Sequence, residues 1–333
     1  MRRLTPAVAA LLTALLVAGC GERQEKLGPS GTRQLEVMLD WVPNPDHAGV
    51  YAAAGQGYFD RVGLDVEIRR PADPSEPIKQ VAAGRVDLAI SYEPEVLRAR
   101  DEGQKVVAVG AVVPKPLTSV ISLPPKTVPD AGALRGKTVG TAGIDYQDAF
   151  LDAMLRRANV DPGQVRRRNV GFDLQKALLT GRVDATLGGF ENVEVVELDL
   201  KKKNPTHFTV DEAGIPSYDE LVLVTSESTL ARKRDQIRSF LGALARGTQL
   251  AERDPSVAAG FLARANRELD PKLLAEGTRR TPFAPAGGRQ FGYQDPAQWK
   301  AFAQFMKRAG ILKNDPDAGA AFTNDLLPGL PEG

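Results

Sequence analysis

The chain has 333 residues, which is enough for two ordinary domains or for one large domain with two lobes. Apolar residues make up 42% and charged residues 26%, a composition typical of a globular protein and not of a disordered or membrane-embedded one. With 43 Lys and Arg against 42 Asp and Glu, the net charge of +1 gives no basic field that would indicate binding to nucleic acid.

The N-terminal residues predict an exported lipoprotein. Two arginines precede a short apolar stretch, 7–17, and the sequence Val-Ala-Gly-Cys then ends at Cys20. This order is typical of a signal peptide, 1–20, whose final cysteine is diacylated; an ordinary cleaved signal peptide is the alternative. Cys20 is the only cysteine, so no disulfide is expected. Polar residues 21–33 predict a flexible tether. Together, the signal peptide, Cys20 and this tether predict a protein outside the cytoplasm that is held by a lipid anchor.

From residue 35 onward, short apolar runs alternate with amphipathic stretches. This alternation is typical of parallel βαβ units and predicts an α/β domain. We expect strands at 35–39, 64–68, 87–91 and 105–113, and helices at 47–56, 75–83 and 94–102.

A second series with the same order of elements occupies about 130–215. The tetrapeptide Gly-Arg-Val-Asp occurs once in each series, at 84–87 and at 181–184, after a predicted helix and before a predicted strand. We interpret each copy as a glycine-capped helix end that leads into a strand. In the second series we expect strands at 136–143, 165–170, 184–189 and 207–210, and helices at 146–160, 172–180 and 192–203.

Two strand-like runs, 117–123 and 220–226, flank the second series, and a mainly helical pattern follows them. If the chain passes from one lobe to the other in the first run and returns in the second, the molecule is a two-lobed α/β protein with a two-strand hinge. Ligands of such sheets bind outside the carboxyl ends of the strands, here between the lobes. The predicted lobes are 34–120 plus 226–333 for lobe 1, and 124–220 for lobe 2.

The segments that follow the predicted strand ends are rich in Asp, Glu and aromatic residues and contain no Lys or Arg. A bound sulfonate, nitrate or phosphate would favour Arg, whereas carboxylates with aromatic faces suit a flat, nitrogen-rich ring or a cation. The alternative is that some carboxylates only stabilise helix N-termini. These segments are 40–51, 91–97, 141–150, 188–198 and 216–221.

Some individual residues in these segments could have a structural role instead of binding a ligand. Trp41 could also be core packing, and a lone His such as His47 is more often a residue at a helix start than a catalyst. No zinc spacing, P-loop, nucleophile elbow or Cys–His pair is present, so we predict no catalytic site, cofactor or metal. The candidate ligand-binding residues are Trp41, Asn44, His47, Ser91, Tyr92, Glu93, Tyr146, Phe190, Glu191, Asn192, Tyr218 and Glu220.

Four stretches resemble a known family: LDWVPNPDHAGVYAAAGQGYF, GRVDLAISYEPEVL, GRVDATLGGFENVEV and GIPSYDELVLVTSE. They are similar to the proteins that bind thiamine pyrimidine precursors, which are lipoproteins of ABC importers with the type II periplasmic-binding-protein fold. The resemblance implies a monomer that delivers its ligand to an ABC permease. It also implies a pyrimidine held between aromatic rings and read by Asn and Glu. The residues in matching stretches are Trp41, Asn44, Tyr92, Glu191 and Glu220.

Other functions stay open at this point. Riboflavin is an alternative flat ligand. A sulfonate such as taurine is a further alternative, but it conflicts with the absence of Lys and Arg from the segments after the strand ends. A sensor module is a third, and it would need a partner kinase. The same superfamily contains the fungal thiamine pyrimidine synthase, which consumes its own histidine and a lysine-bound pyridoxal phosphate. That enzyme has a Lys and a His in the corner after Asp87 and a cysteine-rich iron motif. Here the corner is Ser-Tyr-Glu-Pro-Glu, 91–95, so we expect a binding protein and not an enzyme.

Overall fold

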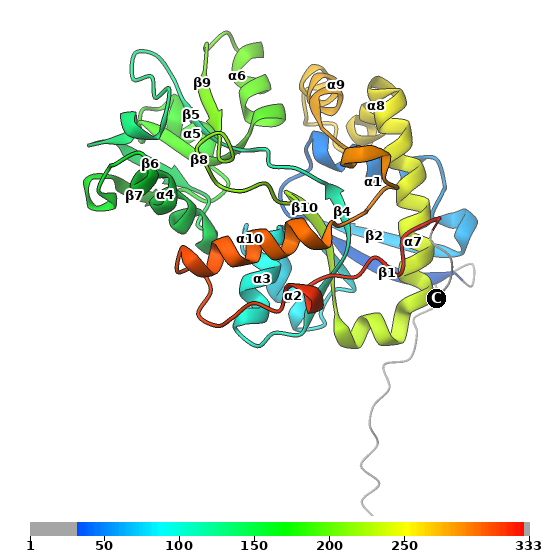
Figure 1. Ribbon diagram of the computed structural model, residues 1–333. Coiled ribbons are helices and arrows are strands. Elements are labelled where there is room, and N and C mark those ends of the chain that lie inside the picture. Colours follow the sequence, from blue (N-terminus) through cyan, green and yellow to red (C-terminus); the bar gives the residue numbers. More distant parts are fainter. Residues whose placement is uncertain (1–31, 330–333) are drawn as a thin grey trace, which may run out of the picture.

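The computed structural model describes residues 32–329, which form two five-stranded sheets with helices on their faces. The two sheets belong to two lobes that lie side by side (Figure 1). The predicted lipidation site Cys20 and almost all of the tether lie outside the described residues. The α/β fold class predicted from the alternating pattern is confirmed.

The sheet of lobe 1 has the strand order β2-β1-β3-β10-β4. Strands β1, β2 and β3 are parallel, and β10 runs antiparallel between β3 and β4. Every residue of β4 and β10 is buried, because both strands are covered on both faces and are therefore continuous apolar runs. The strands are β1 (Arg33–Met38), β2 (Leu64–Arg69), β3 (Leu88–Ser91), β4 (Val106–Val113) and β10 (Leu221–Ser226), with helices α1 (Ala48–Gly55), α2 (Glu76–Ala82) and α3 (Glu93–Asp101).

The sheet of lobe 2 has the order β7-β6-β8-β5-β9, with β5 antiparallel to both of its neighbours. The predicted helix at 192–203 is shorter than expected and starts with a π-helical turn, η5 (Glu191–Val195). The other elements are β5 (Thr118–Ser122), β6 (Thr138–Thr141), β7 (Arg166–Asn169), β8 (Ala185–Phe190), β9 (Thr206–Thr209), α4 (Asp145–Arg157), α5 (Leu174–Leu179) and α6 (Val196–Leu200).

The two predicted hinge strands each belong to one sheet. β5 lies inside the sheet of lobe 2 and β10 inside the sheet of lobe 1, so the chain crosses between the sheets at 114–117 and 210–220. Movement of the lobes about these two segments stays a prediction. The expectation of parallel pairing holds only for β1, β2 and β3 and for β6, β7 and β8.

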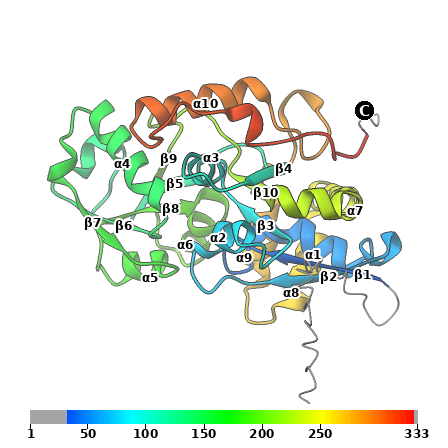
Figure 2. The same cartoon turned by 90° about the horizontal axis from the view of Figure 1, so that it is seen from below.

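The C-terminal helices pack against both lobes (Figures 1 and 2). Helix α7 packs on α1 of lobe 1, and α9 contacts η5 of lobe 2. On α10, Phe302 and Phe305 meet the ring of Phe150 on α4 with centroid distances of 6.2 and 6.5 Å. The C-terminal elements are α7 (Glu227–Arg253), α8 (Pro255–Ala265), α9 (Pro271–Arg280) and α10 (Pro296–Arg308).

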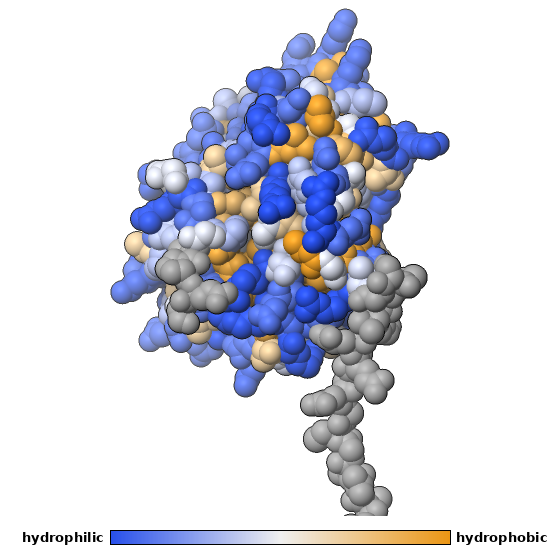
Figure 3. Space-filling view, turned by 90° about the vertical axis from the view of Figure 1, so that its right-hand side faces the viewer, coloured by the Kyte–Doolittle hydropathy of each residue, from blue (hydrophilic) through white to orange (hydrophobic). Residues whose placement is uncertain are grey.

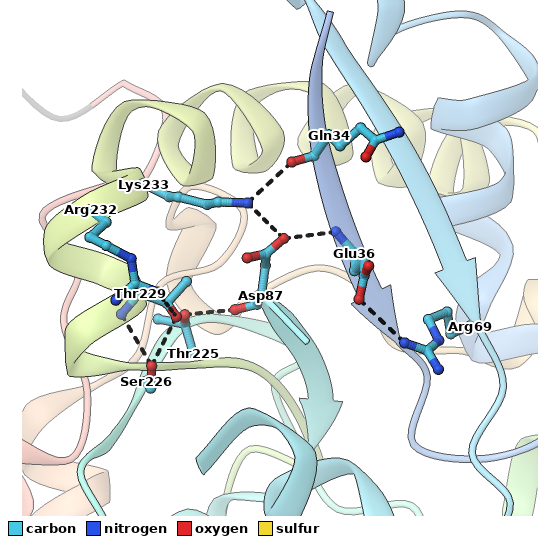
Figure 4. Close-up of polar contacts among 9 residues, drawn as sticks. All are labelled: Gln34, Glu36, Arg69, Asp87, Thr225, Ser226, Thr229, Arg232 and Lys233. Atoms are coloured by element: carbon cyan, nitrogen blue, oxygen red, sulfur yellow. Dashed lines mark hydrogen bonds and ion pairs between the residues drawn. The ribbon is translucent and has the colours of Figure 1, made fainter. Parts of the chain in front are cut away.

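The first Gly-Arg-Val-Asp corner ties three elements of lobe 1 together (Figure 4). Gly84 has φ +64°, a left-handed conformation that glycine adopts without strain. The Oδ2 atom of Asp87 accepts the backbone N–H of Glu36 on β1 at 3.0 Å and the ammonium of Lys233 on α7 at 2.9 Å. The hydroxyl of Thr225 on β10 donates to the carbonyl of Asp87 at 2.7 Å. This corner is therefore structural.

The second corner repeats the same arrangement in lobe 2. Gly181 has φ +67°. The Oδ2 atom of Asp184 accepts the backbone N–H of Thr138 on β6 at 2.8 Å, and its Oδ1 pairs with the ammonium of Lys126 at 2.6 Å. In both lobes the aspartate fixes the start of one parallel strand against its neighbour and neutralises a lysine.

Hydrophilic side chains cover most of the face in Figure 3, with apolar residues in small groups between them. No helix within residues 32–329 combines the length and apolarity needed to span a bilayer. The large apolar side chains exposed in the described part of the chain are Val42, Leu179, Leu200 and Val257.

Candidate functional site

The candidate site is the seam between the lobes, where the strand ends of both sheets meet. β1 and β3 end at Met38 and Ser91, and β6 and β8 end at Thr141 and Phe190. Since β10 and β5 run antiparallel, their first residues lie at the same edges; Thr118, for example, pairs with Phe190. The segments expected to line the cleft therefore converge at this seam.

Asp40 organises the lobe 1 side of the seam. This buried carboxylate accepts the phenol of Tyr92 at 2.8 Å through Oδ2, and its Oδ1 lies 2.8 Å from Nε2 of His47. The backbone N–H of Asn44 donates to Nδ1 of His47 at 3.1 Å, so Nε2 is the imidazole atom that donates to Asp40. The predicted candidates His47 and Tyr92 are thus both positioned by one carboxylate.

Asn44 holds the short helix η1 (Pro45–His47) in place. Its side-chain oxygen accepts the backbone N–H of Asp46 at 2.9 Å, and its amide donates to the carbonyl of Val42 at 3.3 Å. Asn44 is therefore the N-cap of this helix. A direct contact between Asn44 and a ligand stays a prediction.

The side chain of Asp46 makes a hydrogen bond across the seam. Its Oδ1 accepts the amide of Asn192 on η5 at 2.6 Å, and the same amide donates to the hydroxyl of Thr281 at 2.7 Å. Burial raises the pKa of Asp46 to about 6, although the hydrogen bond from Asn192 and the nearby His47 oppose this shift. This buried hydrogen-bond cluster of Asp46, Asn192 and Thr281 thus joins lobe 1, lobe 2 and the segment after α9.

The close approach at this point requires Gly277 on α9. A Cβ atom there would lie 2.7 Å from the carbonyl oxygen of Asn192 and 2.8 Å from Cβ of Pro45, distances that real side chains do not adopt. The π-helical turn η5 that carries Asn192 directly follows β8, and such turns are frequent at functional sites.

Glu220 connects the two crossing segments. Its carboxylate accepts the backbone N–H groups of Leu117 and Thr118 at 2.6 and 2.7 Å, the Thr118 hydroxyl at 2.8 Å and the Tyr218 phenol at 3.1 Å. Burial raises the pKa of Glu220 to about 7 against the effect of these donors. Both of its oxygens are engaged by the protein, so the predicted candidates Tyr218 and Glu220 hold the connection between the lobes.

Tyr146 brings lobe 2 into the same polar region. Its ring lies 5.8 Å from that of Tyr92 between centroids, across the seam. Burial, followed by the charge of Glu220, raises the pKa of the Tyr146 phenol well above its usual value. Aromatic candidates of the two lobes therefore lie close together across the seam. Their contact with a ligand stays a prediction.

Glu93 anchors α10 to the site. Its Oε2 accepts the backbone N–H of Asp219 at 2.7 Å and the amide of Gln298 at 2.9 Å. Asp219 in turn accepts the indole N–H of Trp299 at 2.9 Å. Burial raises the pKa of both carboxyl groups, that of Asp219 to about 7.

The remaining candidates differ in their surroundings. The Ser91 hydroxyl donates to Glu95 at 2.7 Å, and Phe190 is buried at the end of β8. Glu191 is partly exposed, and its backbone N–H donates to the carbonyl of Leu117 at 3.2 Å. Trp41 is also partly exposed and contacts Phe172 of lobe 2. A ligand-binding role for these side chains stays a prediction.

Acceptor atoms dominate the buried polar groups of the seam. Within residues 32–329, the acceptor atoms Asp46 Oδ2 and Asn192 Oδ1 are buried without a hydrogen-bond partner. The buried polar residues of the same range include many carboxylates and neither Lys nor Arg. Unpaired buried acceptors are costly, so this arrangement favours a molecule that brings N–H donors. The described residues contain no cluster of ligands suited to a metal ion.

Sequence patterns do not identify three residues that lie at the seam. Thr281 follows α9 and lies 235 positions after its partner Asp46, a separation that carries no local signal. The sequence predicts Thr118 only as part of a strand, and Phe172 only as the first residue of a helix. Their roles depend on contacts between lobes, which periodicity does not reveal.

Comparison with known proteins places the chain among thiamine-related proteins. It is 31% identical over 327 residues to the formylaminopyrimidine-binding protein of Halalkalibacterium halodurans, covering 95% of this chain and 97% of that one. A Haemophilus influenzae protein named for thiamine biosynthesis is 36% identical over 281 residues, 84% of this chain and 88% of that one. The 4-amino-5-hydroxymethyl-2-methylpyrimidine phosphate synthase of Aspergillus parasiticus is 26% identical over 314 residues, 89% and 88% of the two chains.

Solved structures with the same fold are more distant in sequence. The alkanesulfonate-binding protein of Xanthomonas axonopodis pv. citri, bound to MOPS, matches with a TM-score of 0.69 and 15% identity over 87% of this chain and 98% of that one. The nitrate-binding protein of Synechocystis PCC 6803 matches with a TM-score of 0.66 and 14% identity, covering 88% and 86%. These matches establish the two-lobed type II periplasmic-binding-protein fold.

The family model described as NMT1/THI5 like matches residues 44–258, a span that includes η1, both Gly-Arg-Val-Asp corners and most of the seam. Together with the relative that is 36% identical, this match shows that the chain belongs to the NMT1/THI5-like family.

Proposed function

We propose that the protein is the substrate-binding component of an ABC importer and binds a thiamine pyrimidine precursor of the formylaminopyrimidine or hydroxymethylpyrimidine type. The ligand is held at the seam and the lobes close over it. The observation that carries this proposal is the pair of buried acceptors at the seam, Asp46 and Asn192, in a structure without a buried Lys or Arg among residues 32–329. An aminopyrimidine supplies N–H donors to such acceptors and a flat ring to the neighbouring aromatic side chains.

The similarity to a formylaminopyrimidine-binding protein over nearly the full length of both chains supports this ligand class. A sulfonate or nitrate fits less well despite the shared fold. An anion in a buried site needs positive charge or aligned donors, and the seam offers carboxylates. Riboflavin is a second flat ligand, and its larger ring system demands a wider space between the lobes.

An enzyme of the synthase type is the alternative from another class. In the corner after β3 this chain has Ser91, Tyr92 and Glu93. Their side chains donate to or accept from protein groups, namely Glu95, Asp40 and Gln298, and provide no amine for a covalent cofactor. A binding role therefore agrees better with this corner than catalysis does.

The proposed setting is outside the cytoplasm, with Cys20 as the lipidated residue, the globular part as a monomer and an ABC permease as the partner. The order of the first twenty residues supports export and anchoring. Metabolic labelling with a radioactive fatty acid tests the anchor: the wild type should incorporate label and the Cys20→Ala variant should not.

Thermal unfolding with a panel of compounds tests the ligand class. A molecule that binds only the folded state at about one hundred times its Kd stabilises it by about 2.7 kcal/mol. Formylaminopyrimidine or hydroxymethylpyrimidine should raise the Tm by several degrees, whereas taurine should leave it unchanged. A rise with riboflavin or taurine alone would contradict the proposal.

A further inference from the structure

Phe172 occupies an unusual place for a phenylalanine. It lies in the turn between β7 and α5 of lobe 2, where the N–H of Asp173 donates to the carbonyl of Val170 at 3.0 Å. Gly171 inside this turn has φ +54°, a left-handed conformation that favours glycine. Phe172 directly follows this glycine in the turn.

The ring of Phe172 finds its partner in the other lobe. Its centroid lies 4.5 Å from that of Trp41, with an interplanar angle of 85°, which is the edge-to-face geometry that aromatic rings prefer. Each of the other eleven phenylalanines of the chain belongs to an apolar cluster, whereas Phe172 belongs to none of those found within residues 32–329. Trp41, by contrast, packs on the main cluster.

The position of β7 makes this contact sensitive to opening of the lobes. β7 is an edge strand, three strands away from β5, with which the chain enters lobe 2. At about 4.8 Å between strands, the turn after β7 lies about 14 Å from that crossing. A rotation of lobe 2 about the crossing segments therefore moves Phe172 farther than it moves residues beside β5.

We infer that Phe172 is a positioning residue for ligand binding: its ring covers Trp41 when the lobes close and keeps the tryptophan in place over the bound ligand. The inference rests on the proposed function, which supplies the ligand. In the open molecule the ring of Phe172 loses this partner and is exposed to water. The contact therefore stabilises the closed state alone and raises ligand affinity through closure.

The test combines calorimetry with acrylamide quenching of tryptophan fluorescence. The chain has two tryptophans; Trp299 is fully buried, so quenching reports mainly on the partly exposed Trp41. Phe172→Ala should bind formylaminopyrimidine about two- to tenfold more weakly, the range expected for one aromatic pair. Ligand should protect Trp41 from acrylamide in the wild type, and much less in this variant.

Two further variants separate positioning from general damage. Phe172→Tyr keeps the ring and should restore both affinity and protection. Phe261→Ala removes a ring that is also partly buried but packs within lobe 1, and it should change neither. If the wild type binds pyrimidine and Phe172→Ala keeps the wild-type affinity and the wild-type protection of Trp41, the inference about Phe172 is wrong. The proposed function then still stands. A wild type that binds no pyrimidine overturns the proposed function and this inference with it.

Discussion

Single carboxylates explain much of how the seam is built, and Glu95 shows the effect of burial most simply. Burial raises its pKa from 4.5 to about 7, while the hydrogen bond from Ser91 lowers it again in part. The folded protein therefore holds this proton more tightly than the unfolded chain does. The stability that this group contributes is complete below pH 4.5 and is lost as the pH rises through about 7.

The Glu95→Gln variant tests whether Glu95 makes the unfolding free energy fall as the pH rises. A shift of this size corresponds to about 3 kcal/mol of unfolding free energy between roughly pH 4 and pH 8. The unfolding free energy of the wild type, measured with urea, should fall over this range more steeply than that of the variant. Glu102→Gln at the exposed end of the same helix is the control and should keep the wild-type slope. A steeper fall in the Glu95→Gln variant would contradict the assignment.

At the scale of elements, α9 determines how closely the lobes approach. Gly277 leaves room for Pro45 and Asn192, which carry the polar contact between lobe 1 and lobe 2. A methyl group at this position must displace one of them. Gly277→Ala should therefore hinder closure more than it affects the separate lobes.

We expect Gly277→Ala to weaken ligand binding by about tenfold or more and to enlarge the ligand-bound molecule in small-angle X-ray scattering. Gly242→Ala on α7 is the matched control, because a Cβ atom there meets nothing within 4 Å. It should leave binding unchanged and stabilise the helix by about 0.5–1 kcal/mol. Wild-type affinity in Gly277→Ala would show that α9 does not limit closure.

The elements also show how far the sequence determines the fold. Periodicity predicts the strands and the helices that follow them, and the repeated corners predict one aspartate per lobe that starts a strand, Asp87 and Asp184. The antiparallel pairing of β5 and β10 escapes prediction, because strand direction depends on the path of the whole chain. The π-helical turn η5 escapes it as well, because the sequence pattern fits an ordinary helix start equally well.

The same distinction applies to the site. The richness of strand ends in Asp, Glu and Tyr predicts where the seam lies and that its polar groups are mostly acceptors. It does not predict which of them bond to one another. Asn44 and Glu220 have protein partners because the loop and the crossing segments need them, and those needs arise only in three dimensions.

On the scale of the whole molecule, contacts across the seam come from both lobes and from the C-terminal helices. Besides the buried polar contacts, an ion pair of 2.9 Å joins Arg98 on α3 to Asp145 on α4 at the partly exposed rim. Such exposed pairs contribute little, so the free energy of closure must come from the buried contacts and from the ligand. A ligand shifts the lobes toward closure only as far as it binds the closed form more tightly.

Isothermal titration calorimetry of the globular part with formylaminopyrimidine tests the central claim most directly. The account predicts one site per molecule with a Kd in the micromolar range or below, and no heat with taurine under the same conditions. The absence of binding to any thiamine pyrimidine precursor at several hundred micromolar, or tight binding of taurine, would contradict it.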